Sequence, residues 1–150
     1  MIKDSKNKEI LKILSNSPLQ TEGAGMLLGG LLENGDFVAL YGDLGAGKTA
    51  FVRGIAKVLV PGADVCSPTY TIVNEYDNGK NRLCHFDMYR IESEDDLESI
   101  GFYDYQDCVI AAEWCEKIEY ALPKKYYRAE IKYVSADSRM IVVEEIGGEK

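Results

Sequence analysis

The chain has 150 residues, of which 46% are hydrophobic and 28% charged, the composition of an ordinary globular protein. This length predicts a single domain, residues 1–150, with room for one sheet and its covering helices. No apolar run approaches the ~20 residues that cross a bilayer, and no secretory signal follows the charged N-terminus, so we expect a cytoplasmic protein. The net charge of −8 argues against direct, strong nucleic-acid binding, because such proteins normally carry a basic stripe.

The first elements predicted along the chain are a strand and a helix. Residues 9–15 form an alternating segment that predicts a strand, and Ser17-Pro18 ends it. Thr21 is the predicted N-cap of the helix, with Glu22 favourably placed in its first turn. The apolar side chains of the helix follow the spacing of an amphipathic helix: Ala24, Leu27, Leu28, Leu31 and Leu32. Asn34-Gly35 ends this helix.

A phosphate-binding loop (P-loop) follows at residues 42–49. Its sequence, GDLGAGKT, fits G-x-x-x-x-G-K-[ST] at every fixed position. Residues 37–41 before it predict a buried strand, and residues 50–59 after it have apolar residues at helical spacing. Strand, glycine loop and helix in this order form a phosphate cradle. The alternative is a glycine-rich turn that matches the pattern by chance.

The chemistry of this loop predicts a nucleoside triphosphate as ligand. Backbone N–H groups would turn inward around a polyphosphate, and the helix N-terminus adds partial positive charge. Lys48 would reach the β- and γ-phosphates, and the Thr49 hydroxyl would ligate Mg²⁺. The predicted nucleotide-binding residues of the loop are Gly42, Asp43, Leu44, Gly45, Ala46, Gly47, Lys48 and Thr49.

The second half of the chain is rich in strand patterns. Residues 69–76 and 82–89 flank the loop DNGKN, which predicts an antiparallel hairpin. Residues 109–112 predict a short buried strand, and residues 126–134 with 139–146 predict a closing hairpin. A short helix begins between the two hairpins, with Ser93 as N-cap and Asp96 at the third helical position. The pattern predicts an α/β fold, a mostly parallel sheet with antiparallel additions and flanking helices.

Two carboxylates stand at predicted strand ends. Asp87 follows the apolar run 83–86, and Glu113 follows 109–112. In a P-loop protein a carboxylate in this setting holds Mg²⁺ or orients the attacking water, and spacing alone does not assign the two roles. Elsewhere such a residue is simply a surface carboxylate. The base-reading motif N-K-x-D of GTPases is absent, since residues 74–77 read NEYD, which favours ATP.

The cysteines and the acidic residues each leave two interpretations. The four cysteines contain no C-x-x-C pair, so reduced and largely buried thiols are favoured over a metal site built from Cys84 and His85. Residues 91–120 hold ten acidic side chains and one basic side chain, Lys117. This segment is either a solvated acidic surface or a docking surface for a basic partner.

Taken together, the motifs at 40–49 (LYGDLGAGKT), 67–70 (SPTY), 85–90 (HFDMYR) and 113–114 (EW) resemble the TsaE (YjeE) family. The resemblance spans about residues 10–145. It implies a bacterial ATPase required for threonylcarbamoyladenosine (t6A) formation on tRNA. Such a protein works with TsaD and TsaB and hydrolyses ATP to switch or reset the complex. The transfer chemistry would belong to TsaD, and tRNA would be reached indirectly through the complex.

The same resemblance implies roles for individual residues. Thr69 would lie in a switch-like loop near the γ-phosphate. Thr49 and Glu113 are the implied Mg²⁺ ligands, and Asp87 is a catalytic or Mg²⁺-linked carboxylate. Thr21 and Arg139 match positions where the family contacts nucleotide. Trp114 would lie beside the site or pack in the core, and Cys115-Glu116 replaces the proline-containing stretch often seen after that tryptophan.

Two rival functions remain open from the sequence. A small-molecule kinase shares the P-loop but usually needs a lid with arginines, and residues 92–127 contain none. The other rival is a nucleotide-dependent binding module without meaningful hydrolysis.

Overall fold

The computed structural model describes residues 7–43 and 46–147, which form a seven-stranded sheet with the order β1-β7-β6-β2-β5-β4-β3. The strands are β1 (Lys8–Ser15), β2 (Phe37–Tyr41), β3 (Val73–Asp77), β4 (Arg82–Asp87), β5 (Val109–Glu113), β6 (Tyr126–Tyr133) and β7 (Arg139–Ile146). The helices are α1 (Pro18–Gly29), α2 (Lys48–Leu59) and α3 (Glu94–Ser99), with short 3₁₀ turns at Phe102–Asp104, Cys115–Lys117 and Glu119–Ala121.

The centre of the sheet is parallel. β6, β2, β5 and β4 are parallel neighbours, whereas β3 and β7 pair antiparallel with the strands beside them. Both predicted hairpins, β3–β4 and β6–β7, are present. All five residues of β5 are buried, as expected for a strand covered on both faces. The predicted α/β fold with a parallel centre and antiparallel additions is confirmed, although the sheet is mixed and not mostly parallel, since three strand pairings are parallel and three are antiparallel.

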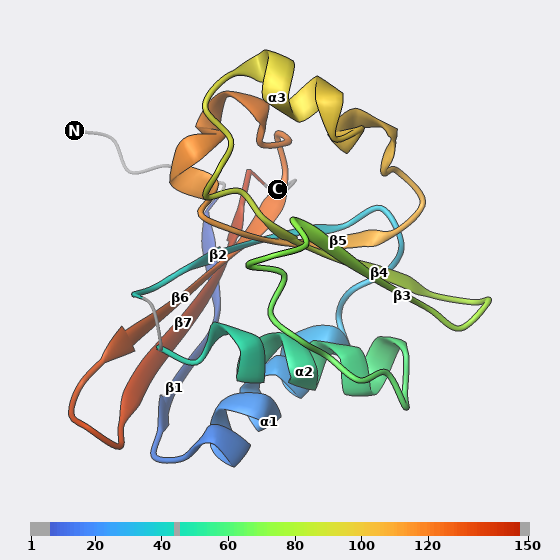
Figure 1. Ribbon diagram of the computed structural model, residues 1–150. Helices are drawn as coiled ribbons and strands as arrows, with labels where there is room; N and C mark the ends of the chain where they lie inside the picture. Colours follow the sequence, from blue (N-terminus) through green and yellow to red (C-terminus); the bar gives the residue numbers. More distant parts are fainter. Residues whose placement is uncertain (1–6, 44–45, 148–150) are drawn as a thin grey trace.

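Helices cover both faces of the sheet (Figure 1). α1 and α2 lie on one face, and α3 with the 3₁₀ turns lies on the other. Strand alternation divides the core accordingly: Val38 and Leu40 of β2 join the cluster under α1 and α2, and Phe37 and Ala39 join the opposite cluster.

Glycines bring α1 and α2 into close contact. A Cβ added to Gly25 would lie 2.0 Å from the Phe51 carbonyl oxygen, and one added to Gly54 would lie 1.9 Å from the Glu22 carbonyl oxygen. Only glycine permits this approach. The ion pair between Lys57 and Glu22, 2.6 Å, spans the same contact. The packing fixes α2, and with it the end of the P-loop.

The start of α1 corrects one prediction. Ser17, not Thr21, is the N-cap, since its hydroxyl accepts a hydrogen bond from the Gln20 N–H at 3.1 Å. Pro18 favours this boundary, because proline is well suited to the first helical position. Thr21 is buried within the first turn, where its hydroxyl is 2.7 Å from the Ser15 hydroxyl.

The amphipathic pattern predicted for α1 is only partly correct. α1 ends at Gly29 and does not continue to Asn34-Gly35 as predicted, so Leu31 and Leu32 lie beyond the helix. Ala24, Leu28 and Leu32 are buried, but Leu27 and Leu31 are 58% and 54% exposed. The helix is apolar around its circumference, so spacing alone does not identify its buried face.

Other boundaries differ by a few residues. β3 begins at Val73 instead of residue 69, because residues 68–72 form a turn in which the Thr71 and Ile72 N–H groups bond the Pro68 carbonyl. Ser93 caps α3 as predicted.

Three of the four free thiols are buried, whereas Cys66 is exposed. Within residues 7–43 and 46–147, no helix has both the length and the apolar character needed to cross a membrane.

Candidate nucleotide-binding site

The P-loop connects the end of β2 to the start of α2. Gly42 has φ +148°, and a Cβ there would lie 2.5 Å from the Ile131 carbonyl oxygen of β6. Gly47 is the N-cap of α2 with φ +112°, and no side chain caps the first turn. The first amides of α2 are thus available to an anion. Of the predicted loop residues, Leu44 and Gly45 lie outside the described residues.

A cavity of about 680 Å³ opens beside this loop, a volume typical of small-molecule sites. Its lining comes from four segments that are far apart in the sequence: the P-loop with α2, the 67–72 loop, the end of β4 and the end of β5. The lining residues are Gly47, Lys48, Thr49, Ser67, Thr69, Ile72, Asp87, Tyr89, Arg90, Glu113 and Trp114. All four predicted catalytic residues and both predicted Mg²⁺ ligands are among them.

The charge of Lys48 is held at the cavity. The side chain is 7% exposed, and Nζ donates a hydrogen bond to the Gly42 carbonyl at 2.5 Å. Nζ also lies 5.7 Å from the ring centroid of Trp114, within the range of a cation–π contact. The ammonium is therefore placed beside the phosphate-binding backbone.

Asp87 and Glu113 face the cavity as a register pair of β4 and β5. The carboxyl ends of parallel strands meet at one edge of a sheet, which brings the two carboxylates side by side. An Asp87 oxygen accepts from the Tyr89 N–H at 2.9 Å, and the Asp87 N–H donates to the Ile72 carbonyl at 2.8 Å. Glu113 has its Oε2 2.7 Å from Nε2 of His85.

His85 is a contact that the sequence analysis missed. From the sequence, His85 is predicted only as a possible metal ligand beside Cys84 and as the first residue of the motif 85–90, with no role toward Glu113. Strand alternation could have linked His85 to Asp87, since the two lie on one face of β4, but its contact with Glu113 depends on the pairing of β4 with β5.

The described residues contain no cluster of three or more His, Cys, Asp or Glu side chains that could hold a metal ion. A Mg²⁺ ion at this cavity would therefore take few protein ligands, such as the Thr49 hydroxyl and one carboxylate. Phosphate oxygens and water would complete its shell, which is the usual pattern for this ion. The donor set fits Mg²⁺ with a nucleotide.

Two strained residues border the cavity. Ile72 and Trp114 are the non-glycine residues with positive φ in the described chain, at 71° and 62°. A β-branched residue in this region costs about 1–3 kcal/mol and is found chiefly at functional sites. Ile72 ends the predicted switch-like loop, and Trp114 directly follows Glu113. Within that loop, Thr69 is exposed and its hydroxyl lies 2.7 Å from that of Ser67.

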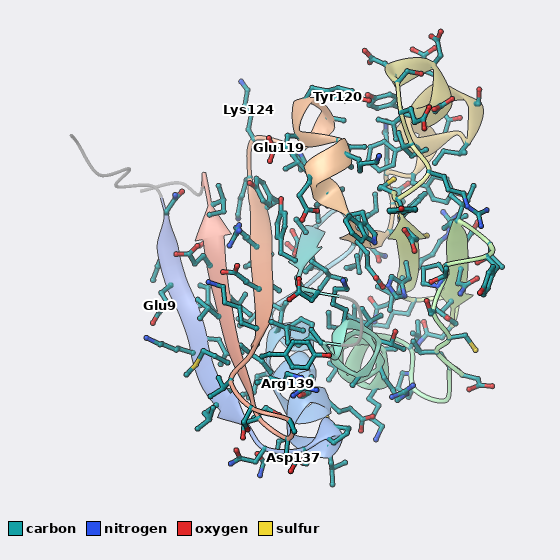
Figure 2. All side chains as sticks on the ribbon, turned by 60° about the vertical axis from the view of Figure 1, so that its left-hand side comes forward. Glu9, Glu119, Tyr120, Lys124, Asp137 and Arg139 are labelled. Atoms are coloured by element: carbon teal, nitrogen blue, oxygen red, sulfur yellow. The ribbon has the colours of Figure 1, made fainter. Side chains whose placement is uncertain are left out.

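Arg139 and Thr21 both lie at the P-loop. Figure 2 shows Arg139 at the end of the sheet that carries Asp137, opposite the end with Glu119, Tyr120 and Lys124. Its Nε donates to the Ala46 carbonyl at 3.1 Å, and Nη1 donates to carbonyls of the β6–β7 hairpin. A Cβ added to Gly47 would lie 3.6 Å from the Thr21 methyl, so the two residues are neighbours. For both residues, nucleotide contact stays a prediction.

Known proteins are similar to this chain in sequence and in fold. The family described as "Threonylcarbamoyl adenosine biosynthesis protein TsaE" matches residues 15–141. The chain is 36% identical over 137 residues to the tRNA threonylcarbamoyladenosine biosynthesis protein TsaE of Bacillus subtilis, covering 91% of this chain and 87% of that protein. It is 40% identical over 111 residues to the protein of the same name from Haemophilus influenzae, covering 73% and 70%.

The structural comparison agrees with the sequence comparisons. The crystal structure of Bacillus subtilis YdiB superposes with a TM-score of 0.78 at 33% identity, covering 96% of this chain and 90% of that one. On the strength of the family match and these relatives, the chain belongs to the TsaE family.

Proposed function

We propose that this chain is a Mg²⁺-dependent ATPase that acts with TsaD and TsaB in forming t6A on tRNA. One observation carries the proposal: Lys48 and Thr49 of the P-loop line the same cavity as Asp87 and Glu113. A phosphate-binding element thus faces the carboxylates that hydrolysis requires. The family match supports the pathway, and the acidic chain leaves most of the tRNA binding to its partners.

The P-loop would bind and orient the triphosphate. The Lys48 ammonium and backbone amides of the loop would bond phosphate oxygens, and such preorganised donors would stabilise the charge that develops during phosphoryl transfer. The absence of a GTPase base-reading motif favours ATP over GTP. Thr21 and Arg139 would hold the loop in place through their contacts with Gly47 and Ala46.

The Thr49 hydroxyl and Glu113 would hold Mg²⁺, which when bound would neutralise charge on the β- and γ-phosphates. Asp87 would orient the attacking water or the water ligands of the ion. The Asp87 N–H donates a hydrogen bond to the carbonyl of Ile72, so a movement of the 67–72 loop would act on the backbone that carries the Asp87 carboxylate. Thr69 on that loop would sense the γ-phosphate, and release of the loop after hydrolysis would reset the complex.

ATP turnover measured with and without TsaD and TsaB tests this function. We expect slow Mg²⁺-dependent release of phosphate by the isolated chain and faster release in the complex, because a partner would complete the site. Fast hydrolysis by the chain alone would contradict the partner-dependent mechanism. Absence of hydrolysis under all conditions, with ATP bound, would support the binding-module alternative.

The kinase alternative is separated by following the γ-phosphate. Radiolabelled ATP incubated with the chain and a metabolite extract should yield only inorganic phosphate. Label on any small molecule would instead indicate a kinase. Arg90 lines the cavity just outside the arginine-free segment, so this control is necessary.

A further inference from the structure

His85 occupies a position that core packing alone does not explain. It is the one histidine of the chain, lies in the middle of β4 and is fully buried. On the same face of β4, Leu83 belongs to the core under α1 and α2, and Asp87 lines the cavity. The imidazole therefore lies between the apolar core and the floor of the cavity.

The hydrogen bonds of the ring define its tautomer. Nε2 is 2.7 Å from Glu113 Oε2, whereas Nδ1 is buried and has no hydrogen-bond partner among the described residues. In a neutral ring, a proton on Nδ1 would be a buried donor without an acceptor, and Nε2 would then present a lone pair to a carboxylate. The arrangement is satisfied when the proton is on Nε2, so the ring donates to Glu113.

This donation restricts a flexible side chain. The backbone of Glu113 is fixed by its pairing in β5 and by the Met88 N–H, which donates to its carbonyl at 3.0 Å. Its side chain still has three rotatable bonds, and the hydrogen bond to His85 holds one of its two oxygens, Oε2. Trp114, with its left-handed backbone, turns the chain away immediately afterwards.

We propose that His85 is a positioning residue that holds Oε2 of Glu113 so that Oε1 is presented to the cavity, toward Mg²⁺ or the water it orders. The inference rests on the proposed function, because that function gives Glu113 its role. Residues that hydrogen-bond a metal-binding carboxylate from behind orient it and commonly change metal affinity when replaced. His85 itself touches neither substrate nor metal.

The tautomer can be measured on the unmodified protein. Because the chain has one histidine, an ¹⁵N correlation spectrum of the imidazole contains a single spin system. We expect Nε2 to carry a proton even without any metal or nucleotide, because its hydrogen bond to Glu113 is already present in the protein alone. An Nε2 without a proton, or an imidazole that averages between tautomers, would overturn the inference whether or not the protein hydrolyses ATP.

Matched variants test the consequence for the site. His85→Gln keeps a donor at the Nε2 position and one buried acceptor, whereas His85→Met keeps apolar volume without a donor. His85→Asn, whose amide is too short to reach Glu113, replaces the Met variant if that protein does not fold. Mn²⁺ binding to the protein with a non-hydrolysable ATP analogue would be followed by electron paramagnetic resonance. Trp114 fluorescence would follow nucleotide binding without metal.

We expect the Met or Asn variant to bind Mn²⁺ about 10- to 100-fold more weakly, with the Gln variant close to wild type. Metal-free nucleotide affinity should not change. Equal Mn²⁺ affinity in all variants would overturn the positioning role and leave the proposed function intact. If the wild type itself binds no Mn²⁺ with nucleotide, the proposed function fails instead, and the tautomer measurement still decides whether His85 donates to Glu113.

Discussion

The two faces of the sheet differ in what they bury. The core beneath α3 and the 3₁₀ turns consists of apolar residues and cysteines, among them Phe86, Phe102 and Ile118. The α1/α2 side carries the buried polar and charged residues of the described chain: Ser15, Thr21, Glu22, Lys48, His85, Asp87 and Glu113. Burying a polar group costs folding free energy unless the group is hydrogen-bonded. The concentration of such groups on one side of the sheet is therefore typical of a functional site.

The largest expected effect tests the apolar side. Phe102 is 5% exposed, and its ring centroid lies 5.5 Å from that of Phe86. Phe102→Ala should lower the free energy of unfolding by about 3–5 kcal/mol, because it leaves a cavity in the core. Urea denaturation measures the loss. The ATP affinity of the folded protein should remain near that of the wild type, and a large loss of affinity would show that the two sides are not separable.

The next effect tests the polar side. Glu113→Gln keeps the size of the side chain but removes its charge at the cavity. Hydrolysis in the TsaD–TsaB complex should fall about 100-fold, as expected when a metal-holding or general-base carboxylate is lost. ATP affinity measured without Mg²⁺ should be retained, as should stability to within about 1 kcal/mol. If cells keep t6A although hydrolysis is lost, nucleotide binding alone suffices and the ATPase role is wrong.

Two glycine substitutions test the close packing of α1 against α2. A Cβ at Gly54 meets the Glu22 carbonyl, so Gly54→Ala should cost about 1–3 kcal/mol and displace the helix that begins the site. A Cβ at Gly23 on the same helix pair has nothing within 4 Å. Gly23→Ala should stabilise by about 0.5–1 kcal/mol through helix propensity. Thermal unfolding of both proteins checks the pair, and equal losses would contradict the close packing.

The smallest effect concerns the acidic surface outside both cores. Asp95 and Glu98 of α3 are exposed, whereas Asp96 is partly buried and its carboxylate accepts from the Glu92 N–H. Asp95→Lys with Glu98→Lys therefore changes surface charge and leaves this capping contact in place. If α3 docks on a basic partner, affinity for TsaD–TsaB should fall about three- to tenfold, and less at high salt. Unchanged affinity would identify a merely solvated surface.

Local patterns predicted much of the molecule. The P-loop, the hairpins and the apolar runs before Asp87 and Glu113 are encoded within a few neighbouring residues, so their positions follow from sequence alone. Parallel pairing then predicts that Asp87 and Glu113 share an edge. The N-cap of α1 was missed because Thr21 and Ser17 are both acceptable caps, and the preference for Pro18 at the first position decides between them.

Contacts between distant segments could not be predicted. His85 meets Glu113 only because β4 pairs with β5 in one register, and Arg139 reaches Ala46 only because β6 lies beside β2. The exposure of Leu27 depends on which side of the apolar helix α1 meets α2 and the sheet. These features belong to the tertiary arrangement.

The proposed function requires that ATP hydrolysis at this cavity drives repeated t6A formation. The most direct test reconstitutes TsaD, TsaB, tRNA and threonylcarbamoyl-adenylate with ATP, and adds either the wild-type chain or Lys48→Ala. We predict many t6A products per complex with the wild type and no more than one with the variant. If neither protein changes the yield while the wild type still binds ATP, the proposed function is wrong.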